Sequence, residues 1–139
     1  MKRNLFRWVV VSLFAVGFGV AAHAQEPDRL VVNIPYDFVV NGKTLPAGTY
    51  NVKRNSEREP RILSISSTEN HAYVVTMPTD VNQVNESRPA VTLLHIGEQN
   101  FLTKIQTAEH VFTIPNSGAA GAKVDRTTYL AGTSEPSKR

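Results

Sequence analysis

Residues 36–50 read YDFVVNGKTLPAGTY, and this stretch carries the clearest fold signal of the chain. Tyr36, Phe38 and Val40 stand at every second position, the spacing that places side chains on one face of a β-strand. The dipeptide at 41–42 is Asn-Gly, which tolerates the positive φ angles of a tight hairpin turn. The Pro-Ala-Gly tripeptide at 46–48 predicts a corner, because proline cannot donate to a strand ladder and glycine relaxes a turn. The stretch therefore predicts a β-hairpin followed by a corner into another strand.

Short runs of the same kind continue through the rest of the chain. No segment after residue 24 sustains helical apolar spacing over three turns. The pattern predicts an all-β fold, a single small antiparallel β-sandwich or partly open barrel of about seven to eight strands. Beyond the first hairpin, the expected strands cover residues 30–34, 49–54, 61–66, 72–77, 90–96, 101–107 and 111–114.

Polar stretches separate these runs and delimit the domain. Residues 79–89 are polar and are expected to form a long loop, which is a frequent place for function. Residues 124–130 are expected to pair only weakly. We assign residues 25–132 to one β domain and residues 133–139 to a disordered polar tail.

The first 24 residues have the order of features that defines a secretory signal peptide. Lys2 and Arg3 give a basic start, residues 9–20 form an uncharged and almost wholly apolar run, and Ala22-His23-Ala24 supplies the small-residue cleavage pattern. The run is shorter than the roughly 20 apolar residues of a transmembrane helix. We expect cleavage after Ala24, a periplasmic or secreted location, and no transmembrane segment in the remaining chain.

The charge balance and the lack of cysteine limit the kinds of partner and chemistry that the protein can have. The whole chain has 15 Lys and Arg against 12 Asp and Glu, but Lys2, Arg3 and Arg7 belong to the signal peptide, so the remainder is balanced. A nucleic-acid partner would need a basic patch, and none is expected. The chain has no cysteine, which excludes disulfides, thiol chemistry and cysteine zinc sites. The expected partner is an unknown protein or a component of the cell envelope, and the oligomeric state stays open.

The sequence contains no motif for catalysis or cofactor binding. It lacks G-x-G-x-x-G, the Walker lysine motif, G-x-S-x-G and H-E-x-x-H. His71, His95 and His110 are not spaced to share a metal ion. We therefore expect no enzymatic activity, no cofactor and no metal, and we assign no catalytic, cofactor-binding or metal-ligating residue. A small hydrolase that uses Asp37 or His95 is the enzymatic alternative.

The aromatic residues are expected to fill the core. Most fall on strand faces beside aliphatic residues, where packing is the default role of an aromatic ring. A sugar-stacking platform would prefer an exposed tryptophan or tyrosine, and the only tryptophan, Trp8, lies in the signal peptide. The aromatic residues after residue 24 are Tyr36, Phe38, Tyr50, Tyr73, Phe101, Phe112 and Tyr129.

Residues 34–50 resemble a family of small exported bacterial proteins that open with F-x-V-x-G-K-x-L-P-A-G-x-Y-x-V. Residues 93–105, LLHIGEQNFLTKI, are similar to the second hairpin of that family. The resemblance covers roughly residues 30–107, and the chain departs from the family's polar ending after Ala108. The family has no assigned activity, so the resemblance implies an exported β protein and no site residues.

Three functional classes follow. The leading hypothesis is an exported non-enzymatic β module that binds or scaffolds in the cell envelope or outside the cell, through an edge strand or the 79–89 loop. The second is a small carrier that encloses an apolar ligand in a barrel cavity. The third is the small hydrolase.

Overall fold

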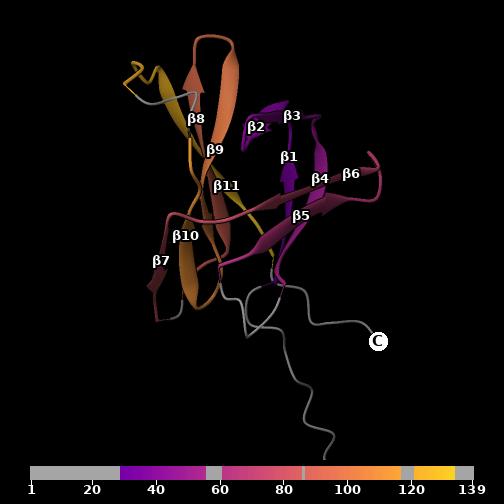
Figure 1. Ribbon diagram of the computed structural model, residues 1–139, viewed down its shortest axis with the longest axis vertical. Helices are drawn as coiled ribbons and strands as arrows, with labels where there is room; N and C mark the ends of the chain where they lie inside the picture. Colours follow the sequence, from indigo (N-terminus) through magenta and orange to yellow (C-terminus); the bar gives the residue numbers. More distant parts are fainter. Residues whose placement is uncertain (1–28, 56–60, 86, 117–120, 134–139) are drawn as a thin grey trace, which may run out of the picture.

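The protein folds into two packed β-sheets without any helix among the residues that the computed structural model describes, which are 29–55, 61–85, 87–116 and 121–133 (Figure 1). The sheets do not close into a barrel, so the sandwich alternative of the sequence prediction is confirmed. The expected signal peptide and residues 134–139 of the expected tail lie outside the described residues. No helix in the described ranges could cross a membrane.

The smaller sheet is wholly antiparallel. Its four strands follow the order β1-β4-β5-β6, so β1 and β6 are its edges. β4 alternates between buried apolar and outward polar residues, which is the pattern of a sheet with one solvated face, whereas β5 also buries Ser64 and Ser67. The strands are β1 (Arg29–Ile34), β4 (Gly48–Arg54), β5 (Leu63–Ser67) and β6 (Ala72–Thr76).

The larger sheet has seven strands. Its main path is β11-β8-β9-β10-β7, and the β2–β3 hairpin joins it through one parallel pairing of Val39 with Phe101. Asn41 and Gly42 in that hairpin have φ values of 52° and 77°, as the Asn-Gly turn predicts. The strands are β2 (Phe38–Val40), β3 (Lys43–Leu45), β7 (Asp80–Gln83), β8 (Ala90–Ile96), β9 (Gln99–Gln106), β10 (His110–Thr113) and β11 (Arg126–Ala131).

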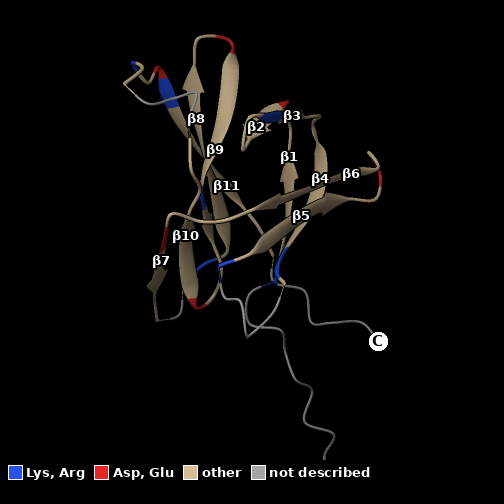
Figure 2. Cartoon of the chain, viewed as in Figure 1, with Lys and Arg blue, Asp and Glu red and all other residues tan. Residues whose placement is uncertain are grey.

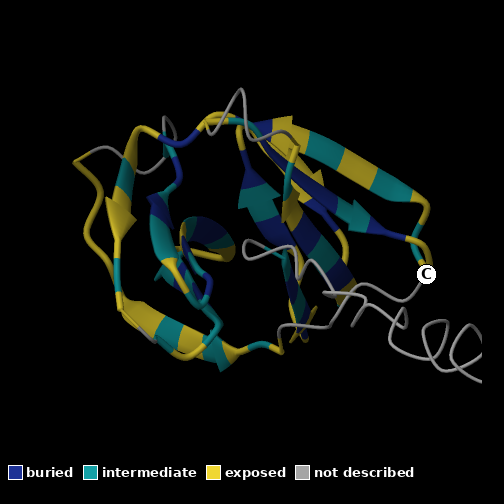
Figure 3. Cartoon of the chain, turned by 90° about the horizontal axis from the view of Figure 1, so that it is seen from below, coloured by how far each residue is buried: buried dark blue, intermediate teal, exposed yellow. Residues whose placement is uncertain are grey.

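The hydrophobic core is built from buried residues of both sheets, and their positions are dark blue in Figure 3. Phe38 from the larger sheet packs edge-to-face on Tyr50 from the smaller one, with ring centroids 5.0 Å apart. This contact holds the β2–β3 hairpin against β4. An edge-to-face aromatic pair stabilises the folded state by more than the burial of its apolar area alone. Other core residues include Leu30, Ile34, Leu63, Ile65, Leu93, Ile105 and Phe112.

The structure corrects the strand count. The described residues form eleven strands rather than seven or eight, and the β2–β9 pairing is parallel. β7 forms within the expected 79–89 loop because Asp80–Gln83 pairs with β10, although its sequence is polar. Antiparallel pairing with β10, which lies far along the chain, stabilises β7 although its side-chain pattern gives no signal.

The C-terminal part of the domain is also more ordered than expected. β11, expected only as a weak pairing, matches β8 over six residues. Thr133, assigned to the tail, bridges Val31 with two main-chain hydrogen bonds of 2.8 Å. This bridge covers the β1 edge of the smaller sheet at Val31, whereas no strand among the described residues pairs with the outer side of β6.

Candidate functional site

Residues 46–50, the Pro-Ala-Gly-Thr-Tyr stretch, form a structural corner. The Tyr50 hydroxyl donates to the Pro46 carbonyl at 2.6 Å, and the Ala47 amide donates to Asp37 Oδ1 at 3.0 Å. The Ala47 carbonyl accepts from Asn70 Nδ2 at 3.0 Å. The polar groups of the corner are therefore engaged within the molecule, so the motif specifies architecture.

Gly48 completes the corner for a steric reason. A β-carbon at this position would overlap the side-chain amide of Asn70. Asn70 cannot simply turn away, because that amide holds the Ala47 carbonyl. The glycine thus allows the β5–β6 turn to pack directly on the start of β4.

Burial sets the ionisation of Tyr50 in the same corner. Tyr50 is fully buried, and desolvation raises the pKa of its hydroxyl above the ordinary 10.0. A side-chain hydrogen bond with Asn70 opposes this change in pKa, while the negative charges of Asp37 and Glu69 add to it. The neutral hydroxyl is the form that donates to Pro46.

Asp37 and His95, named for the hydrolase alternative, are connected only through Asn100. His95 Nδ1 lies 2.9 Å from Asn100 Oδ1, and Asn100 Nδ2 donates to the main-chain oxygen of Asp37 at 3.1 Å. The Asp37 carboxylate instead accepts from Ala47. The His95–Asn100 contact lies within the β8–β9 hairpin, and the other two contacts join Asp37 to that hairpin and to the corner, which is a structural arrangement.

The other two histidines lie apart from this group. His71 sits in the β5–β6 turn with φ of 50°, and His110 begins β10, where its ring lies 5.8 Å from that of Phe112. Within the described ranges, no group of three or more metal-ligating side chains comes together.

The strongest candidate for a binding surface is the edge strand β6. Tyr73, Val75 and the following Met77 alternate along it and are 55%, 38% and 61% exposed, whereas Val74 and Thr76 face inward. β6 is the last strand of its sheet and carries no charged residue (Figure 2). We call Tyr73, Val75 and Met77 the β6 stripe.

The main chain of β6 also faces outward at the stripe. The Tyr73 carbonyl accepts a hydrogen bond of 3.2 Å from Lys43 Nζ, so it points away from β5. In an antiparallel ladder the main-chain groups of every second residue point the same way, so those of Val75 face the open edge too. Among the described residues they have no partner on that side.

Tyr73 belongs to a set of exposed tyrosines that the core expectation missed. Phe38, Tyr50 and Phe112 are buried as expected, but Tyr36, Tyr73 and Tyr129 are 39%, 55% and 75% exposed. Tyr73 and Val75 lie on one face of the strand and Val74 on the other. Because both faces carry apolar side chains, the sequence does not show which face is buried. Only the position of β6 at the edge decides it.

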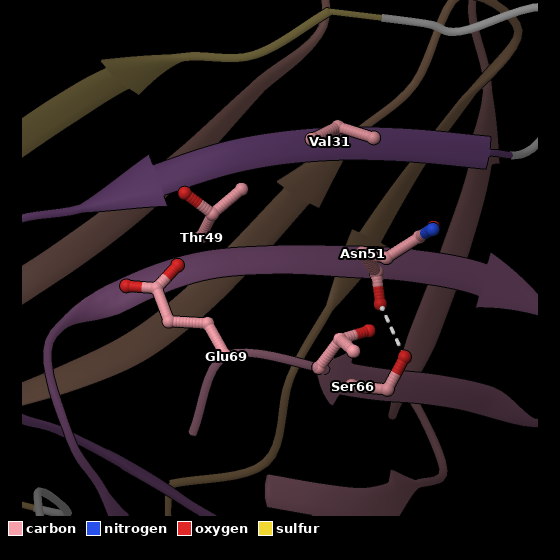
Figure 4. Close-up of a pocket in the computed structure, with 6 residues that line it drawn as sticks. Val31, Thr49, Asn51, Ser66 and Glu69 are labelled. Atoms are coloured by element: carbon pink, nitrogen blue, oxygen red, sulfur yellow. Dashed lines mark hydrogen bonds between the residues drawn. The ribbon is translucent and has the colours of Figure 1, made fainter. Parts of the chain in front are cut away.

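A shallow pocket lies beside the stripe on the outer face of the smaller sheet. Its volume is about 270 Å³, and most of its lining side chains are polar (Figure 4). The core side chains of the same strands point to the opposite face, so this pocket lies outside the sandwich. The lining residues are Val31, Thr49, Asn51, Ser66, Thr68 and Glu69.

Comparisons of the chain with family models, with curated proteins and with solved structures find no significant match. The β6 stripe, its main-chain groups and the neighbouring pocket are therefore the features that indicate a function.

Proposed function

We propose that the protein is an exported, non-enzymatic binding module that captures an extended segment of a partner protein along β6. The observation that carries this proposal is that the exposed apolar side chains of β6 and its outward main-chain groups belong to the same residues, Tyr73 and Val75. Support for export comes from the sequence of residues 1–24.

Strand addition uses both features of β6. Outward N–H and C=O groups supply affinity by extending the ladder, and alternate side chains supply selectivity. The strand carries no charge that would select a charged segment. A partner segment with apolar or aromatic residues at alternate positions would cover Tyr73 and Val75 as it pairs.

Lys43 limits access to this edge. Its ammonium group occupies the Tyr73 carbonyl, which an incoming strand would otherwise use. Lysine at an open edge is a common device against uncontrolled pairing between sheets. An authentic partner must displace Lys43 or begin its pairing at Val75, so the device favours a specific segment over any exposed strand.

Site-specific photo-cross-linking in cells that export the protein tests the proposal. A photoreactive phenylalanine analogue replaces Tyr73 in one protein and Tyr129, a more exposed tyrosine on β11, in the control. We expect a discrete cross-linked protein from position 73 and none of the same size from position 129. Equal patterns at both positions, or no product at position 73, would overturn the proposal.

A main-chain variant separates strand addition from simple apolar contact. Val75→Pro removes an outward amide without taking a hydrogen bond from the β5–β6 ladder, because proline is tolerated where the N–H faces solvent. We expect it to abolish the cross-link from position 73, and Val75→Thr to retain it. The comparison is made on folded protein, with the melting temperature of Val75→Pro measured beside that of Val75→Thr. A cross-link that persists in the folded Pro variant contradicts strand addition.

A further inference from the structure

The outer face of the smaller sheet brings side chains from four strands into one row. Val31 is opposite Asn51, Asn51 is opposite Ser66, and Ser66 is opposite Tyr73. Directly opposed residues on one face of a sheet are close neighbours. Tyr73 is therefore the cross-strand neighbour of Ser66, which lines the polar pocket together with Asn51, and its exposed ring lies next to the lining residues without being one of them.

Some hydrogen-bonding groups of the pocket already bond to other groups of the protein. Asn51 Oδ1 accepts from Arg29 Nε at 3.4 Å, and Thr49 Oγ1 accepts from Asn33 at 3.2 Å. The Ser66 hydroxyl donates to the Asn51 carbonyl at 3.4 Å, drawn as the dashed line in Figure 4. These contacts hold the side chains in place and orient them.

Other groups of the pocket keep donors and acceptors available. No hydrogen bond within the described residues involves Asn51 Nδ2, the Thr68 hydroxyl or the Glu69 carboxylate. An amide nitrogen offers two donors, a hydroxyl offers a donor and acceptors, and a carboxylate accepts several hydrogen bonds. The pocket therefore presents donors and acceptors together beside an aromatic ring.

We propose that this pocket and the Tyr73 ring bind one pyranose ring of a neutral oligosaccharide. Sugar hydroxyls are both donors and acceptors, and a carboxylate such as Glu69 accepts from two neighbouring hydroxyls. The C–H face of the sugar packs on the Tyr73 ring. The volume of about 270 Å³ lies just below the range of drug-sized sites, which fits one ring with the chain continuing into solvent.

The charges at the pocket do not favour acidic sugars. Glu69 is the one charged residue among those that line it, and the Arg29 guanidinium lies against the lining residue Asn51, so the two charges oppose each other and give no net charge that would favour an acidic sugar. The proposal does not depend on strand addition, because the sugar needs the lining side chains and the Tyr73 ring but no main-chain group of the edge. Since a partner strand would also cover Tyr73, the two ligands share that ring and should compete for it.

The experiment is a titration of the isotope-labelled protein with maltotriose, cellotriose and chitotriose, followed by NMR shifts of main-chain amides. We expect at least one of them to move the amides of Asn51, Ser66, Glu69 and Tyr73 together and saturably. Saturable shifts confined to other strands, or no saturable shift with any of the three up to millimolar concentrations, overturn the proposal.

Substitutions then test the roles of the ring and the carboxylate. Tyr73→Ser should weaken binding about tenfold or more, and Tyr73→Phe should retain it, because the phenyl ring keeps the stacking face. Tyr129→Ser is the matched control and should change nothing. Glu69→Gln should also weaken binding. Equal affinity for Tyr73→Ser and the wild-type protein contradicts the proposal, whereas Val75→Pro should remove strand capture and leave sugar binding intact.

Discussion

The Pro46–Tyr50 corner and the β6 stripe show two opposite uses of sequence. The corner carries the most recognisable motif of the chain, and its polar atoms are hydrogen-bonded within the molecule. β6 carries no motif, yet it presents exposed apolar side chains and outward main-chain groups. In this protein the recognisable motif builds the fold, whereas the candidate for function is the strand whose apolar side chains and main-chain groups are exposed.

The largest difference in stability is expected between removing the Phe38 ring, which packs on Tyr50 of the corner, and removing the Tyr73 ring of β6. Phe38→Ala should lower the free energy of unfolding by about 3–5 kcal/mol, because Phe38 is fully buried and packs on Tyr50. Tyr73→Ala should change it by no more than about 0.5 kcal/mol, because the ring is exposed. Urea unfolding of both variants measures the difference. Similar losses would mean that β6 is part of the core.

Gly48→Ala tests whether the corner is sterically closed. The added methyl group overlaps Asn70, so we expect a loss of about 1–3 kcal/mol. Gly42→Ala is the control for backbone conformation alone, since nothing lies near its β-carbon. In an Asn70→Ala background the Gly48→Ala loss should shrink, as a double-mutant cycle will show. An unchanged melting temperature for Gly48→Ala would contradict the close approach.

The corner also predicts a pH dependence of stability. Because burial raises the pKa of Tyr50 above 10.0, the folded protein keeps the phenol proton to higher pH than the unfolded chain. This contribution to stability is complete below about pH 10 and is lost as pH rises through the folded pKa. Tyr50→Phe should remove that part of the alkaline loss in melting experiments. An identical alkaline profile for both proteins would contradict it.

Lys43 lies in β3, just before the corner, and donates to the Tyr73 carbonyl of β6. Its removal should have the smallest effect on stability. Lys43→Ala should leave the free energy of unfolding within about 0.5 kcal/mol, since the side chain is exposed. Self-association should rise, because the Tyr73 carbonyl becomes available to another edge. Sedimentation of Lys43→Ala beside Lys43→Arg measures this. A monomer at all concentrations in both variants would show that Lys43 does not protect the edge.

The contrast explains how much of the molecule the sequence reveals. Alternation and turn residues predict the Asn-Gly hairpin, the corner and the β8–β9 hairpin, because these depend on neighbours in the chain. β7 was missed because its pairing with β10, and not its polar side chains, forms the strand. The exposure of Tyr73 was missed for a related reason, since an apolar run does not show which strand ends at a sheet edge.

Hydrogen exchange of the β6 amides tests the central claim most directly. In the isolated protein, the amides of Tyr73 and Val75 should exchange rapidly because they face the open edge, whereas the amide of Val74 should be protected because it pairs with Ile65 in β5. The alternation along a single strand is the decisive feature. Protection of Val75 as strong as that of Val74 in a monomer would show that the edge is covered and would contradict the account.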